Sequence, residues 1–85
     1  MNHQAEFEIQ DVFYIEGRGV VVAGKLLSGE LKPGMGTEIN GKTSGVKSIE
    51  VFNRKADALR AGESAGILLS DVKKEDVSRG TILSF

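Results

Sequence analysis

Cysteine is absent from this chain of 85 residues, and histidine, proline and tyrosine each occur once. Without cysteine the chain can form no disulfide and offers no thiolate for catalysis or metal binding. No apolar run of 18 or more residues occurs, and the N-terminal MNHQAEFE lacks the basic and apolar regions of a secretory signal. We therefore expect a soluble, cytoplasmic protein without membrane contact.

An excess of charge of one sign is also missing. Lys and Arg total 11 and Asp and Glu total 12, which gives a formal net charge of -1. Such a balance supplies no general attraction to phosphate backbones, so any contact with nucleic acid must be local. The length predicts one domain over residues 1–85, with residues 1–5 as a frayed tail. His3, in that tail, is expected to be solvated rather than a metal ligand or base.

The chain has too few convergent titratable groups for an active site, so we expect no enzyme activity, catalytic residue, metal or cofactor. Asp71, Glu75 and Asp76 form an acidic group, but they alternate with Lys73 and Lys74. Because the spacing of a calcium loop is lacking, this segment is expected to be a solvated charged turn.

The stretch DVFYIEGRGVVVAG, from Asp11 to Gly24, predicts a tight β-hairpin. Apolar and polar residues alternate before the turn, with period 2, so that one face carries Phe7, Ile9, Phe13 and Ile15 and the other carries Glu6, Glu8, Gln10 and Glu16. Asp11 interrupts this alternation. Gly17 and Gly19 permit the reversal and leave the Arg18 side chain free to project.

Turn signals recur about every ten residues along the rest of the chain, as expected of an all-β sandwich or barrel. Pro33-Gly34 predicts a type II turn, and Asn40-Gly41 predicts a type I′ hairpin. Short strands are expected at 37–39, from 42 onward, at 46–52, 65–69 and 81–85, with one helical turn within 71–76. We therefore predict an all-β fold, a small closed barrel of about six strands.

The alternation also predicts the residues of the core. Our candidates are Phe7, Ile9, Phe13, Ile15, Val20, Val22, Val46, Ile49, Phe52, Ile67, Leu69 and Ile82.

DVFYIEGRGVVVAGKLLSGELKPGM resembles the opening of the second domain of elongation factor Tu and of other translational GTPases. The resemblance continues through SIEVFNRKADALRAGESAGILLSDVKKEDVSRGTILSF, so it covers about Phe7 to Phe85. It implies a six-stranded barrel connected with translation, either as a complete small protein or as a domain cut from a larger GTPase. No GTP is expected to bind this chain alone, because the Gly17-Arg18-Gly19 turn joins strands and lacks the GxxxxGK[ST] pattern.

In elongation factor Tu the corresponding domain receives the terminal adenosine of aminoacyl-tRNA. Carried over by motif, the resemblance implies a ligand pocket formed by Gln10, Ile15, Gly17, Arg18 and Leu68. Two departures bear on it: Gln10 stands where the elongation factor has a glutamate, and Ser70-Asp71 stands where it has Arg-Gly. Tyr14 is expected on the face opposite Ile15.

Two further roles stay open. Several translational GTPases contact ribosomal RNA through this domain, and Arg54, Lys55 and Arg60 are the candidates for that contact, although they also fit a solvated loop. The barrel could instead be a protein-interaction module, which exposed apolar residues beside Arg18 would favour. Ile15 and Leu68 also fit a purely structural role in the core.

Overall fold

The structure, a computed structural model, describes residues 4–52 and 54–85. Residues 1–3 of the predicted tail, which include His3, lie outside the described part, and so does Asn53. The strands are β1 Ala5–Ile15, β2 Gly19–Leu31, β3 Gly36–Ile39, β4 Lys42–Val51, β5 Arg54–Ala56, β6 Leu59–Arg60, β7 Ser64–Leu69 and β8 Ile82–Ser84. A single turn of 3₁₀ helix, η1, spans Lys74–Asp76.

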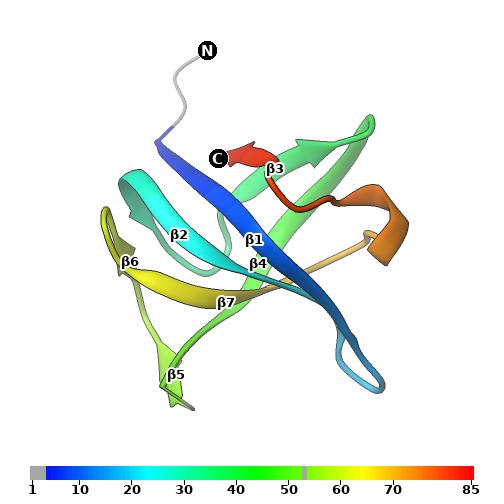
Figure 1. Cartoon of the computed structure of the whole chain (residues 1–85), viewed down its shortest axis with the longest axis horizontal. Helices are drawn as coiled ribbons and strands as arrows, with labels where there is room; N and C mark the ends of the chain where they lie inside the picture. The colour runs from blue at the N-terminus through cyan, green and yellow to red at the C-terminus, as the bar shows by residue number, and fades with distance from the viewer. Residues whose placement is uncertain (1–3, 53) are drawn as a thin grey trace.

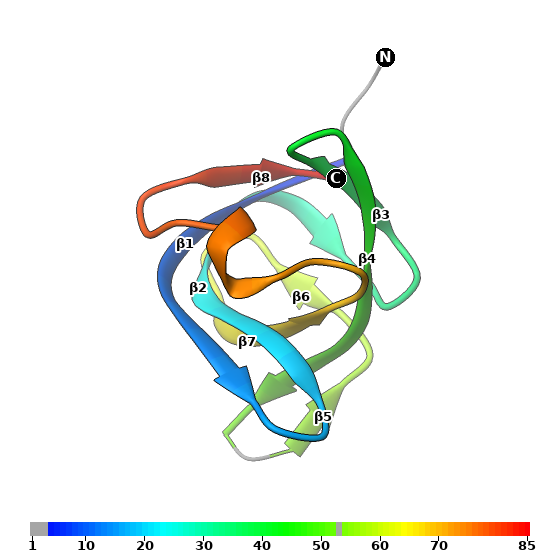
Figure 2. The ribbon, with the colours of Figure 1, turned by 90° about the vertical axis from the view of Figure 1, so that its right-hand side faces the viewer.

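Six of the strands form one continuous antiparallel path in the order β3-β4-β7-β2-β1-β8, while β5 pairs with β4 and β6 pairs with β2. The long strands β1, β2 and β4 curve around a common centre (Figure 1), and the view along the barrel shows β8 and β3 approaching each other at the ends of the path (Figure 2). The predicted six-stranded barrel is confirmed, and the barrel is nearly closed.

The predicted turns form as their residue types require. Met35 N donates to Lys32 O at 3.2 Å across the Pro33-Gly34 turn, and Gly34 has a φ of 96°. Asn40 and Gly41 both have positive φ, 50° and 77°, as a type I′ turn demands. At the first hairpin, Arg18 N donates to Ile15 O at 2.9 Å and Gly17 has a φ of 83°.

Eight of the predicted core residues are buried: Phe7, Ile9, Val20, Val22, Val46, Ile49, Ile67 and Leu69. The prediction missed eight others that complete the core cluster, namely Ala5, Leu26, Leu31, Ile39, Leu59, Val77, Leu83 and Phe85. Ala5 is 2% exposed and begins β1, so the ordered strand starts inside the predicted frayed tail.

Phe13 and Ile15 were wrongly assigned to the core, because β1 contains a bulge. The register shifts between Ile9 and Asp11, which leaves Gln10 as the extra residue opposite β2. One extra residue exchanges the two faces of a strand for every position that follows. Val12 consequently packs against the core, while Phe13 and Ile15 are 48% and 38% exposed.

Phe52 and Ile82 are also exposed, at 91% and 49%, and the prediction that they belong to the core is wrong. Phe52 follows the last residue of β4 and has a φ of 51°, so it lies in a turn rather than in a strand. Ile82 lies on β8, where Leu83 pairs with Phe7 and is the residue that enters the core.

Among the described residues, no helix is long and apolar enough to cross a membrane.

Candidate functional site

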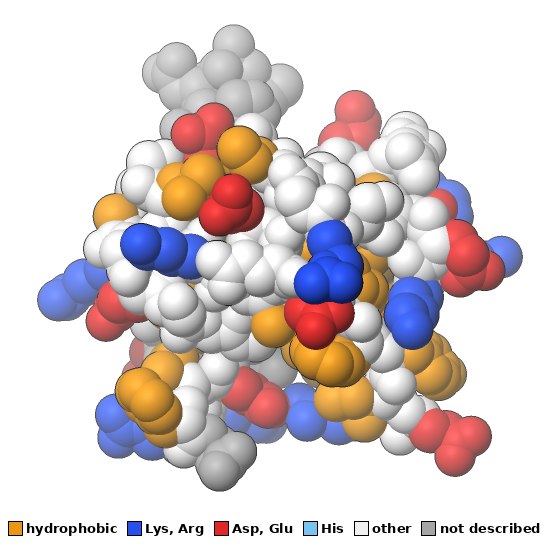
Figure 3. Space-filling view, in the orientation of Figure 1, with side chains coloured by type: hydrophobic (Ala, Val, Ile, Leu, Met, Phe, Trp, Pro, Cys, Tyr) orange, Lys and Arg blue, Asp and Glu red, His pale blue; other side chains and the backbone are white. Residues whose placement is uncertain are grey.

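The bulge in β1 creates an apolar patch on the outer face of the barrel. Beyond the bulge, Phe13 pairs with Val21, which pairs in turn with Leu68 on β7. Ile15 pairs with Gly19, and a Cβ on Gly19 would lie 3.9 Å from Leu68 Cδ1. We refer to Phe13, Ile15, Val21 and Leu68 as the outer patch. Figure 3 shows hydrophobic side chains gathered over this end of the hairpin, at the lower right.

Leu68 belongs to the outer patch although only 9% of it is exposed. Its neighbours Ile67 and Leu69 point into the core cluster, which does not include Leu68. Strand alternation therefore directs Leu68 outward, where Val21 on the adjacent strand covers part of it. Phe13 remains the most exposed residue of the patch, at 48%.

Arg18 lies in the hairpin turn beside Ile15, where its backbone N–H donates to Ile15 O, and its side chain binds Glu50 on β4. The Arg18 guanidinium donates a hydrogen bond to the Glu50 carboxylate and forms an ion pair with it, and the two side chains are 39% and 37% exposed. The Arg18 hydrogen bond and charge lower the pKa of Glu50, and Glu50 raises the pKa of Arg18. Both groups are therefore charged at neutral pH, and the charge of Arg18 is locally compensated.

Gln10, the bulge residue, lines a shallow groove of about 360 Å³ on the same side of the sheet. Glu50 and the turn residue Phe52 line this groove as well, above a floor of small residues that comprises Ala23, Gly24, Ala65 and Gly66. The Gln10 carbonyl accepts a hydrogen bond of 3.2 Å from Arg79 Nε, which fastens the bulge to the loop before β8.

The structure thus places the five predicted ligand residues along one outer surface. Gln10 lines the groove, Ile15 and Leu68 belong to the outer patch, and Gly17 and Arg18 form the hairpin tip. An added Cβ on Gly17 would meet nothing within 4 Å, so the tip is open. Whether these residues bind a ligand stays a prediction.

Sequence reasoning missed three residues of this surface: Phe13, Val21 and Glu50. Continuing the alternation of inward and outward residues past Asp11 assigned Phe13 to the core, and only the register shift between Ile9 and Asp11 reverses that assignment. The surface consequently offers an aromatic ring on the same face as Ile15. Tyr14, which is 61% exposed, alternates with them on the strand.

The three basic candidates for RNA contact do not form one cluster. Arg54 and Lys55 lie on β5, where Lys55 pairs with Glu50 in the ladder with β4. Arg60 lies on β6, and its Nε is 3.7 Å from a carboxylate oxygen of Glu30. All three are exposed, but Arg60 is already ion-paired.

The acidic turn is held by internal bonds. Lys73 N donates to Asp76 Oδ2 at 2.9 Å, and Lys42 Nζ lies 3.0 Å from the same oxygen. The backbone N–H of Lys73 and then the Lys42 ammonium lower the pKa of Asp76 to about 2. Across residues 4–52 and 54–85, no group of three or more His, Cys, Asp or Glu side chains is placed to hold a metal ion.

Comparison with known proteins agrees with this architecture. Residues 19–84 match the family described as elongation factor Tu domain 2. Among solved structures, the chain is similar to translation elongation factor SelB from Methanococcus maripaludis in its apo form, with a TM-score of 0.85 and 27% sequence identity. The match covers 94% of this chain and 18% of the SelB chain, so the similarity concerns one domain-sized part of that factor.

Proposed function

Because the chain belongs to the elongation factor Tu domain 2 family, we propose that it is a non-catalytic binding module of translation that holds a single-stranded RNA end on its outer surface. Binding is weak, and it involves Gln10, Ile15, Gly17, Arg18 and Leu68 together with Phe13. Transfer RNA and ribosomal RNA both present the required chemistry. The chain by itself binds no GTP, and a cytoplasmic location stays a prediction.

The observation that supports this function most is the aromatic ring of Phe13, half-exposed beside Val21 and Leu68. Unpaired bases are recognised by stacking on aromatic rings and by contacts with apolar side chains. The open glycine tip lets a ribose or phosphate approach the backbone, and the Gln10 side chain can donate to or accept from a sugar hydroxyl.

Electrostatics limits the affinity of this surface for RNA. Arg18 is neutralised by Glu50, and Asp11 is exposed opposite Ala23 on the same face. Few counterions are released when so few cations meet phosphates, so RNA binding depends only shallowly on salt.

A protein partner is the second candidate, and the exposed aromatic residues favour it. Phe13 and Phe52 are 48% and 91% exposed, and both lie on or beside the outer surface. Aromatic side chains are enriched where proteins meet. Since Arg18 and Glu50 already satisfy each other, an apolar partner surface could cover the patch without leaving either of these two charges unpaired.

The two functions are separated by fluorescence anisotropy with a short, labelled RNA ending in CCA. Phe13→Ala should weaken RNA binding about fivefold or more, because stacking of a base on an aromatic ring is worth ~1–3 kcal/mol. Leu27→Ala is the matched control, since Leu27 is 41% exposed on β2 but lies near the opposite end of the hairpin. Equal affinity of both variants would refute the RNA function at this surface.

A further inference from the structure

The barrel is incompletely closed along one seam, between β3 and β8. These strands end the hydrogen-bonded path, and no backbone ladder joins them within the described residues. One side-chain bond links them, from Thr37 Oγ1 to Ser84 O at 2.6 Å. The two strands are therefore held together near Ser84, while a gap remains towards Ile82.

Both strands turn unused backbone groups towards this seam. Ala5 and Phe85 exchange backbone hydrogen bonds, and Ile9 N donates to Thr81 O at 2.9 Å. By alternation, the N–H and C=O groups of Ile82 point away from β1 and into the seam. On β3, Ile39 pairs with Lys42 across a two-residue turn, so the backbone groups of Glu38 also face the seam.

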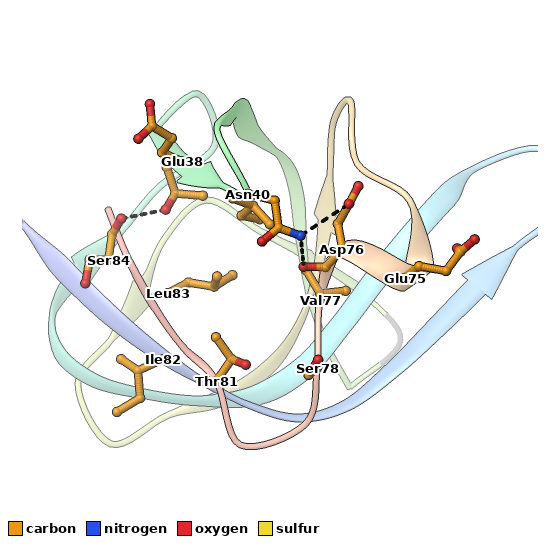
Figure 4. A pocket seen from close by; sticks show the side chains of 12 residues that line it. Glu38, Asn40, Glu75, Asp76, Val77, Ser78, Thr81, Ile82, Leu83 and Ser84 are labelled. Carbon is orange, nitrogen blue, oxygen red and sulfur yellow. Dashed lines mark hydrogen bonds between the residues drawn. The ribbon is translucent and has the colours of Figure 1, made fainter.

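A cavity of about 440 Å³ occupies the open part of the seam and is bounded by β3, η1 and β8. Figure 4 shows Leu83 pointing into it and the Asn40 side chain reaching Asp76 across one end. Leu83, Ile39 and Val77 line the cavity and are 5–7% exposed. Its volume lies within the range of ~300–1,000 Å³ that is usual for ligand sites.

The charged residues that line this cavity are all acidic: Glu38, Glu75 and Asp76. Lys42 compensates Asp76, but Glu38 and Glu75 have no ion pair among the described residues. The two glutamates stand at opposite sides of the rim in Figure 4. Positive charge on a ligand is favoured by both carboxylates, whereas the phosphates of RNA are repelled at this place.

We propose that the seam binds an extended, basic segment of a partner protein, which adds to the free edge of β8 at Ile82. The backbone of the segment pairs with the N–H and C=O groups of Ile82, as in other cases of strand addition. One apolar side chain of the segment covers Leu83 and Val77, and flanking Lys or Arg side chains meet Glu38 and Glu75. Side chains alternate along an extended strand, so a segment of alternating basic and apolar residues fits both requirements.

The probe is a blocked peptide of alternating Lys and Val, with a peptide of alternating Glu and Val as its charge control. Titration into the ¹⁵N-labelled chain should shift the amide resonances of Ile82 and Glu38 with the basic peptide only. The Ile82 amide should also exchange more slowly with solvent when the peptide is bound, because a backbone hydrogen bond then protects it. Equal binding of both peptides, or binding without protection of Ile82, would overturn the proposal.

Charge reversal at the rim tests the recognition of the basic side chains. Glu38→Lys and Glu75→Lys should each weaken peptide binding about two- to fivefold, as expected for exposed ion pairs. Glu16→Lys is the control, since Glu16 is exposed in the hairpin turn and does not line the seam. Equal losses of peptide affinity in all three variants would mean that only net charge matters, which contradicts the proposal. A dimer that the chain forms by itself through β8 would identify a second copy as the occupant and would also contradict it.

Discussion

Gly24→Ala should destabilise the barrel strongly, because no space exists for a methyl group where Gly24 on β2 lies against the paired strand β1. A Cβ on Gly24 would lie 1.8 Å from the Glu8 carbonyl oxygen and 3.1 Å from Phe7 Cε2. The nearest obstacle is backbone in a paired strand and cannot rotate aside. Ordinary C···O contacts are about 3.3 Å or longer, so the strands would have to separate by about 1.5 Å.

Overfilling of a packed core costs about 1–3 kcal/mol, and a fixed backbone neighbour places Gly24→Ala at the upper end of that range. One kcal/mol changes the melting temperature of a domain this small by about 4–8 °C, so a decrease of roughly 10–20 °C is expected.

The assay is thermal unfolding followed by far-UV circular dichroism, with Gly36→Ala as the control. A Cβ on Gly36, also in a strand, would meet only Ser44 O at the ordinary distance of 3.5 Å. Melting temperatures within about 2 °C for the two variants would refute the close approach of the β1 backbone to Gly24.

Three other predictions follow from the structure. Gly17→Val should lower the free energy of unfolding by about 1 kcal/mol or more, because Gly17 has a φ of 83°; an unchanged denaturation midpoint would remove this argument. Asp76→Asn should destabilise the chain above pH ~4, where aspartate in the unfolded chain is ionised. The difference from the wild type in unfolding free energy should shrink as pH falls towards the folded pKa of about 2, because the bonds that lower this pKa stabilise only the ionised carboxylate. A difference that does not vary with pH would contradict the bonds to Lys73 and Lys42. Calorimetry with GTP and magnesium should detect no binding to this chain, and saturable binding at low micromolar concentration would reveal a nucleotide site that we have missed.

The turns could be predicted from sequence because their geometry depends on local residue type. Asn40-Gly41 and Gly34 adopt the positive φ values that their positions require, whatever surrounds them. The strands between the turns could also be predicted from local sequence, because short runs of β-branched and apolar residues separate those turns.

The faces of some strands could not be predicted, because they depend on pairing with distant residues. Asp11 marked an irregularity in β1, but a bulge is defined by the partner strand, and its effect on Phe13 and Ile15 appears only in the register with β2. In β8, Ile82 and Leu83 are adjacent and equally apolar, so the core residue is decided by the pairing of Leu83 with Phe7. The same limit applies to the outer surface, where Arg18 meets Glu50 from 32 residues away.

Chemical-shift mapping with a short RNA ending in CCA tests the central claim of RNA binding most directly. We predict that resonances of Phe13, Ile15, Gly17 and Leu68 move together and saturably, while those of Ile82 and Glu38 at the seam do not move. If millimolar RNA perturbs no resonance of the outer surface, the RNA function is contradicted and a protein partner at the outer patch is the function that remains.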